Sequence, residues 1–161
     1  MTKHLFAFAL ALLAGVPGYF IFLDRVPPYV ELNAIAVTEV VPPGGKFKMV
    51  LVGIVNRHCY GVIRREFIDS EKVIHAIAPV PPLLAGTLGK ETELSRVITV
   101  PSNMAQGDAV YIGYPEYQCN PFQWVWPIKL KPTVVKFKIA GEKISNVFRP
   151  NLAADSVRIS E

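Results

Sequence analysis

The stretch from Leu5 to Leu23 constrains the fold of this chain more than any other feature. Its 19 residues carry no charge. An α-helix of that length rises roughly 28 Å, close to the ~30 Å hydrocarbon core of a bilayer. The run has no polar face, so a helix buried in a domain core is the least favoured interpretation. We expect a membrane anchor, kinked at Pro17 because proline lacks the backbone N–H of a helix interior.

Charges on either side of this stretch predict its orientation. Lys3 and His4 precede it, whereas the opposite charges of Asp24 and Arg25 follow it. The positive-inside bias favours a cytoplasmic N-terminus, with the rest of the chain in the periplasm or outside the cell.

A cleaved signal peptide is the alternative interpretation of the same stretch. Its apolar core would be 5–14, and the Gly15-Val16-Pro17-Gly18 break would frame cleavage before Tyr19. We prefer the retained anchor because the apolar run continues to Leu23, which would leave an apolar mature N-terminus. Both interpretations export the residues that follow.

Export decides how the cysteines are interpreted. The chain has two, Cys59 and Cys119, and in an oxidising compartment such a pair is most simply a disulfide. A metal site made from these cysteines with His58 and His75 is the weaker alternative, since copper sites need clustered ligands and no histidine follows Cys119. We therefore expect a disulfide, with no metal and no cofactor.

The rest of the chain reads as one strand-rich domain. Fourteen prolines and eleven glycines interrupt it, and no long amphipathic helical period occurs, which is typical of short strands and turns. We expect an all-β domain, an antiparallel β-sandwich of about seven strands. The predicted strands are 29–41, 46–55, 62–68, 73–77, 91–100, 109–119 (broken at Pro115), 124–131 and 133–139. The predicted organisation is an anchor over 1–25, a linker over 26–28, the sandwich over 29–141 and a partly mobile extension over 142–161.

Two segments are similar to a known class of module. Pro43-Gly44-Gly45-Lys46-Phe47-Lys48-Met49, followed by Asn56, resembles the turn and core strand of bacterial immunoglobulin-like and fibronectin-III-like modules. The segment from Gly107 to Tyr111, with Cys119 beyond it, resembles the ending of immunoglobulin domains. The resemblance implies an Ig-like sandwich, and the separation of Cys59 from Cys119 resembles the inter-sheet disulfide. It implies no function, because such modules host many roles.

Three groups of residues are candidates for a partner surface. They are leucines of a predicted long loop over 79–89, aromatic residues near the second cysteine (with Trp126 expected in the core), and lysines spaced two apart on strand faces. The lysines suit an anionic partner, or serve only solubility and edge protection. The candidate partner residues are Leu83, Leu84, Leu88, Tyr114, Trp124, Lys129, Lys131, Lys136 and Lys138.

Catalytic and phosphate-binding motifs are missing from the sequence, including G-x-S-x-G, H-E-x-x-H and G-x-x-x-x-G-K. The net charge of +4 is mild and dispersed, so nucleic acid is not implied as a partner. We expect a non-enzymatic single-pass membrane protein whose exported domain is a structural or interaction subunit of a membrane-associated assembly, either an accessory subunit of a membrane complex or a membrane-embedded virion protein. The alternatives are a secreted binding module released by signal cleavage and, less favoured, a metal-binding or enzymatic periplasmic protein.

Overall fold

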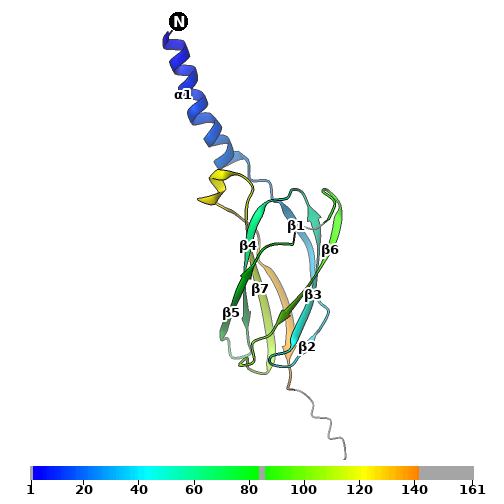
Figure 1. The fold of residues 1–161 in the computed structure, drawn as a ribbon. Helices are drawn as coiled ribbons and strands as arrows, with labels where there is room; N and C mark the ends of the chain where they lie inside the picture. Colours follow the sequence, from blue (N-terminus) through cyan, green and yellow to red (C-terminus); the bar gives the residue numbers. More distant parts are fainter. Residues whose placement is uncertain (1, 84–85, 142–161) are drawn as a thin grey trace, which may run out of the picture.

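The computed structural model describes residues 2–83 and 86–141 (Figure 1). Helix α1 (Thr2–Gly18) leads directly into a π-helical turn, η1 (Tyr19–Leu23), and projects away from a β-sandwich (Figure 1). Because Pro17 has no N–H to donate to the carbonyl of Leu13, the α-helical pattern ends at this point and the wider π-helical turn follows. In the described part of the chain, no single helix is both long enough and apolar enough to cross a membrane.

Two sheets form the sandwich, which confirms the all-β prediction for the domain. The three-stranded sheet has the order β1-β3-β6, and the larger sheet has the order β2-β9-β7-β4-β5, with β8 also paired to β7. The strands are β1 (Tyr29–Ala36), β2 (Val40–Val41), β3 (Lys46–Val55), β4 (Tyr60–Ile68), β5 (Ile74–Val80), β6 (Glu91–Thr99), β7 (Gly107–Gln118), β8 (Ile128–Lys129) and β9 (Thr133–Ile139). The predicted extension over 142–161 lies outside the described residues.

The strand order is that of an immunoglobulin-type sandwich. In such folds, strands A, B and E share one sheet, and C, F and G form the other. Here β1, β3 and β6 take the first three places, and β4, β7 and β9 take the others. All described pairs are antiparallel except β2 with β9.

Alternating side chains build the core between the sheets. Phe47, Met49 and Leu51 of β3 point inward with lysines on the opposite face, as the period-two pattern predicts. Phe47 stacks on Phe137 of β9 with ring centroids 4.4 Å apart, and Phe67 of β4 lies 5.5 Å from Phe137. These rings join both sheets at the core centre.

The predicted first strand, 29–41, is two strands in different sheets. β1 pairs with β3, whereas β2 pairs with Lys138 and Ile139 of β9. The chain crosses between the sheets over 37–39, where the amides of Val37 and Thr38 both bond the carbonyl of Lys48. Both parts are β-rich, so the pattern alone did not reveal the crossing.

The predicted break at Pro115 is also wrong, because β7 continues through it. β7 pairs with β9 up to Gly113 and with β8 from Glu116, so Pro115 falls between two edge partners, where no ladder bond from its nitrogen is needed. On the other side, Pro115 lies opposite Ile63 of β4. The hairpin predicted from 62–68 and 73–77 is confirmed as β4 and β5, although β5 reaches Val80 and so shortens the predicted 79–89 loop.

Candidate functional sites at the helix junction and between the sheets

The helix joins the sandwich through a hydrogen-bonded junction centred on Asp24. Arg57 Nη1 donates to Asp24 Oδ1 at 2.7 Å, and Asn120 Nδ2 donates to Asp24 Oδ2 at 2.8 Å. The hydrogen bond from Arg57, supported by that from Asn120, lowers the pKa of the Asp24 carboxyl below its usual value. Within the predicted 26–28 linker, the Val26 carbonyl accepts a hydrogen bond from Arg57 at 2.6 Å, and the Pro27 carbonyl accepts one from Asn56 at 3.0 Å.

Gln123 completes this junction from inside the domain. The short helix η2 (Pro121–Trp124) is capped by Asn120, whose side chain accepts from the Gln123 amide. This turn directs Gln123 inward, where its Nε2 donates to the Asp24 carbonyl at 2.7 Å and its Oε1 accepts from the Cys119 amide at 2.7 Å. Gln123 is almost fully buried, so the buried side chain of η2 is a polar one.

The predictions for 124–131 are corrected accordingly. A strand over the whole segment is wrong: η2 occupies its start, and only Ile128–Lys129 is β-structure. Trp126 is 59% exposed, so its predicted core position is wrong too. Trp126 instead contacts the helix end, with Phe22 6.5 Å away between ring centroids and the Arg25 guanidinium 5.2 Å from its ring.

The disulfide between Cys59 and Cys119 is confirmed, with Cα atoms 4.7 Å apart. Its location differs from the inter-sheet bridge that the Ig-like resemblance implied. Cys59 precedes β4 and Cys119 follows β7, directly beyond the last ladder pair, Tyr60 with Gln118. The bond therefore closes the end of one sheet, next to the junction.

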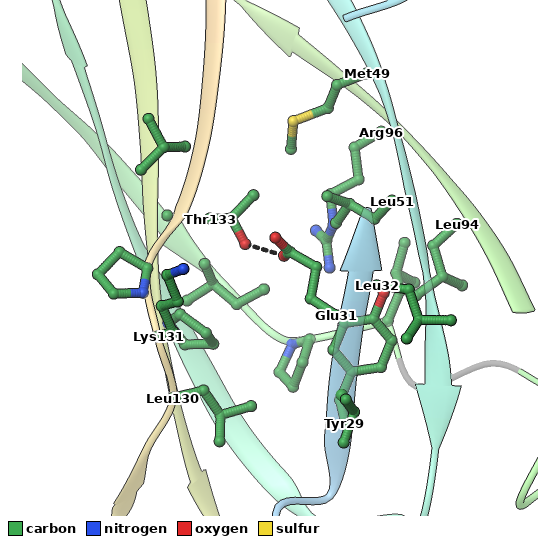
Figure 2. A pocket seen from close by; sticks show the side chains of 18 of the residues that line it. Tyr29, Glu31, Leu32, Met49, Leu51, Leu94, Arg96, Leu130, Lys131 and Thr133 are labelled. Carbon is green, nitrogen blue, oxygen red and sulfur yellow. Dashed lines mark hydrogen bonds between the residues drawn. The ribbon is translucent and has the colours of Figure 1, made fainter. Parts of the chain in front are cut away.

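A groove of about 580 Å³ opens between the two sheets. Figure 2 shows side chains from the three-stranded sheet facing Leu130, Lys131 and Thr133 across it. Pro132, which separates β8 from β9, lines the groove together with its neighbours Lys131 and Thr133. The apolar part of the lining includes Met49, Leu51, Ile63, Leu94 and Leu130.

Polar groups converge inside this mostly apolar groove. Thr133 Oγ1 donates to Glu31 Oε2, which links the sheets across the opening (Figure 2). Arg96 reaches in from β6 and donates from Nη2 to the Pro81 carbonyl at 3.4 Å, while its Nε is buried without a hydrogen-bond partner among the described residues. The buried hydroxyl of Tyr29 likewise has no partner in the described part of the chain.

Burial shifts the pKa values of these groups. It raises the pKa of Tyr29 to about 12, with a further contribution from the Glu31 carboxylate, and it raises the pKa of Tyr117 to about 12. Burial also lowers the pKa of the Arg96 guanidinium, which stays charged near neutral pH. The groove thus offers neutral phenol donors together with two cations, Arg96 and Lys131.

The predicted partner residues are not gathered into one patch. Leu83 and Lys131 line the groove, whereas Trp124 lies at the junction. Tyr114 Oη donates to Glu66 Oε1 at 2.7 Å on the outer face of the larger sheet. Four further predicted partner residues are exposed and lie away from the groove and the junction: Leu88, Lys129, Lys136 and Lys138. The last, Leu84, lies outside the described residues.

The weaker metal-site alternative has no geometric support in the described residues. Cys59 and Cys119 are bonded to each other, and His75 Nε2 lies 2.9 Å from Asp69 Oδ2 at the β4–β5 turn. No group of three or more metal-ligating side chains forms within residues 2–83 and 86–141.

Sequence reasoning missed Glu31 and Arg96, although a signal was present. In β6, Thr92, Leu94 and Ile98 alternate inward, and Arg96 occupies the same phase. A charged residue at an apolar phase of an amphipathic strand indicates an interior polar site.

Comparison with known proteins gives no family for this chain. No protein-family model matches it, and no curated protein sequence matches it. Among solved structures, it is similar to an alkylpurine DNA glycosylase of Pseudomonas fluorescens bound to DNA containing an abasic site analog, with a TM-score of 0.43 and 7% identity over 81% of this chain and 37% of that one. It is also similar to a CARDB domain from Pyrococcus furiosus in complex with di-metal ions, with a TM-score of 0.36 and 10% identity over 72% of this chain and 96% of that one. Neither likeness carries an argument about function.

Proposed function

We propose that this chain is a membrane-anchored, exported interaction subunit of a membrane-associated assembly, and that it is not an enzyme. The observation that carries the proposal is the surface of the N-terminal helix. Every residue from Phe8 to Val16 is exposed, and the large side chains among them are apolar, with Leu13 73% exposed. Apolar surface of this extent on all sides of a helix needs a lipid or protein environment.

The combined length of α1 and η1 supports an anchor. α1 contributes 17 residues and η1 another 5, without an intervening residue. Together they rise roughly 30 Å, which is the thickness of a bilayer core. The pair therefore provides the span that α1 by itself does not.

The flanking charges and the disulfide support export of the sandwich. Lys3 and His4 favour a cytoplasmic N-terminus. A bond between Cys59 and Cys119 suits an oxidising compartment such as the periplasm or cell exterior.

The groove supports binding rather than catalysis. Tyr29 and Tyr117 are neutral phenols near pH 7, and burial raises their pKa values further, while the Glu31 carboxylate accepts a hydrogen bond from Thr133. Leucine side chains line the walls, and the unpartnered Tyr29 hydroxyl and Arg96 Nε are hydrogen-bond donors. These features fit an extended partner segment with apolar side chains and a carbonyl or carboxylate acceptor.

Site-specific cross-linking in membranes tests both halves of this proposal. A photoreactive residue replaces Leu83 at the groove, and a matched control replaces Lys138 on the outer face of β9. After irradiation and an alkaline wash, we expect an adduct in the membrane pellet for Leu83 only, reduced by the additional change Arg96→Gln. Equal adducts at both positions would contradict the groove assignment. Release of the whole protein by the wash would favour the secreted-module alternative.

A further inference from the structure

We propose that the loop 121–127, here called the tryptophan loop, is a second membrane-contact element that lies in the headgroup region of the bilayer beside the helix. The inference rests on the proposed membrane anchor and adds a surface to it. The loop has the sequence Pro-Phe-Gln-Trp-Val-Trp-Pro. No other stretch of the described sandwich places so many large apolar side chains outward within so few residues.

Exposure of the loop follows from its own geometry. Trp124 is 67% exposed, Val125 92% and Trp126 59%. Because η2 turns Gln123 into the domain, its neighbours must point outward. None of the three belongs to the core between the sheets, and among the described residues the ring of Trp126 is contacted by Phe22 and Arg25 of the helix end.

Contacts with the helix end fix the depth of the loop. Phe122 stacks on Phe20 of η1 with ring centroids 6.2 Å apart, and Trp126 meets Phe22 edge-on at 6.5 Å. The hydrogen bond of 2.8 Å from Asn120 to Asp24 holds the two segments together. If Leu23 marks the end of the membrane-spanning run, the loop lies at the same level, where the hydrocarbon core ends.

The chemistry of the loop matches that level. Tryptophan is enriched where a bilayer meets water, because its ring is apolar and its indole N–H is polar. Arg25 lies over the Trp126 ring at 5.2 Å, and Arg57 is paired with Asp24 close by, which places charged groups at headgroup height. Lipid therefore fits this surface as a continuation of the anchor, and the loop would hold the sandwich in one orientation.

Trp124 and Trp126 make a direct test possible, since they are the two tryptophans of the chain. The full chain is reconstituted in phosphatidylcholine vesicles with phosphatidylglycerol, using lipids brominated at shallow or deep acyl positions. Trp124→Phe and Trp126→Phe each leave one reporter. We expect loss of most of the tryptophan emission with shallow bromines, a smaller loss with deep bromines, and protection from aqueous acrylamide.

A matched control places the reporter on the sandwich. Val97 is 59% exposed on the outer face of β6, so Val97→Trp in the Trp124→Phe/Trp126→Phe background should be quenched by acrylamide and not by brominated lipid. Vesicle flotation separates the two proposals. Failure to float would overturn the anchor, whereas floating protein with unquenched, acrylamide-accessible loop tryptophans would overturn the loop proposal alone. Protection from acrylamide without lipid quenching would assign the loop to protein, and a dependence on the protein-to-lipid ratio would make that protein a second copy.

Discussion

At the scale of single residues, Tyr29 is the side chain that shapes the groove. It lies across Gly53 of β3 so closely that an added Cβ there would overlap the Tyr29 ring and lie 2.5 Å from the Val30 carbonyl oxygen. The absence of a side chain at Gly53 thus makes room for the ring. The hydroxyl lies against Gly53 and is buried without a hydrogen-bond partner among the described residues.

We expect Tyr29→Phe to stabilise the partner-free protein by about 1–2 kcal/mol, since it removes a buried, unpartnered hydroxyl. Denaturant unfolding of the full chain in detergent measures this. Tyr114→Phe is the matched control; it loses an exposed hydrogen bond to Glu66 and should cost at most about 1 kcal/mol. If Tyr29→Phe proves the more destabilising change, the hydroxyl has a partner and the binding role of the groove loses its basis.

Residue-level prediction succeeded where side chains alternate and failed where a polar group occupies the interior. The inward positions of Phe47, Met49 and Leu51 follow from period two. The core position predicted for Trp126 rests on the usual burial of large aromatic residues, whereas in the structure Asn120 caps a turn that buries Gln123 and leaves Trp126 exposed. Such a side-chain capping bond has no periodic signature in the sequence.

At the scale of elements, Asp69 organises the hairpin of β4 and β5. Its Oδ1 accepts from the Glu71 and Val73 amides at 3.0 Å each, and its Oδ2 lies 2.9 Å from His75 Nε2. Oδ2 also accepts from the Ala105 amide at 3.2 Å, which ties the turn to the segment before β7. The hydrogen bond to His75, more than those to the backbone, lowers the pKa of Asp69 to about 2.

The lowered pKa of Asp69 predicts a defined acid sensitivity. The pKa of an unfolded Asp is ~3.9, so the stabilising contribution is present above that pH and is lost as the pH falls toward about 2. We expect Asp69→Asn to lower the melting temperature at neutral pH and to flatten its decline between these two pH values. Asp108→Asn, at an 86% exposed side chain, should leave the profile unchanged. Parallel profiles for wild type and Asp69→Asn would contradict this role.

Strand boundaries were predicted most accurately for long strands that turn a row of apolar side chains toward the core. The ranges 46–55, 91–100 and 133–139 match β3, β6 and β9 to within one residue. Prediction failed where the chain changes sheet at 37–39 and where proline falls between two edge partners at Pro115. Both outcomes depend on which strands lie side by side, and a single strand pattern carries no information about its neighbours.

At the scale of the whole molecule, the helix and the sandwich are joined as one unit. The junction connects Asp24 to the segment after β3 through Arg57 and to the segment after β7 through Asn120. The disulfide joins those same two segments, at Cys59 and Cys119. Under the proposed function, a partner bound in the groove would consequently be held at a fixed position relative to the bilayer.

The central claim is that Leu5 to Leu23 is retained as the anchor of the exported sandwich. The most direct measurement is the intact mass of the protein recovered from alkaline-washed membranes, without reduction. We predict a species in the pellet that still contains this stretch and carries the oxidised Cys59–Cys119 pair. A soluble species that begins at or near Tyr19 would contradict the claim.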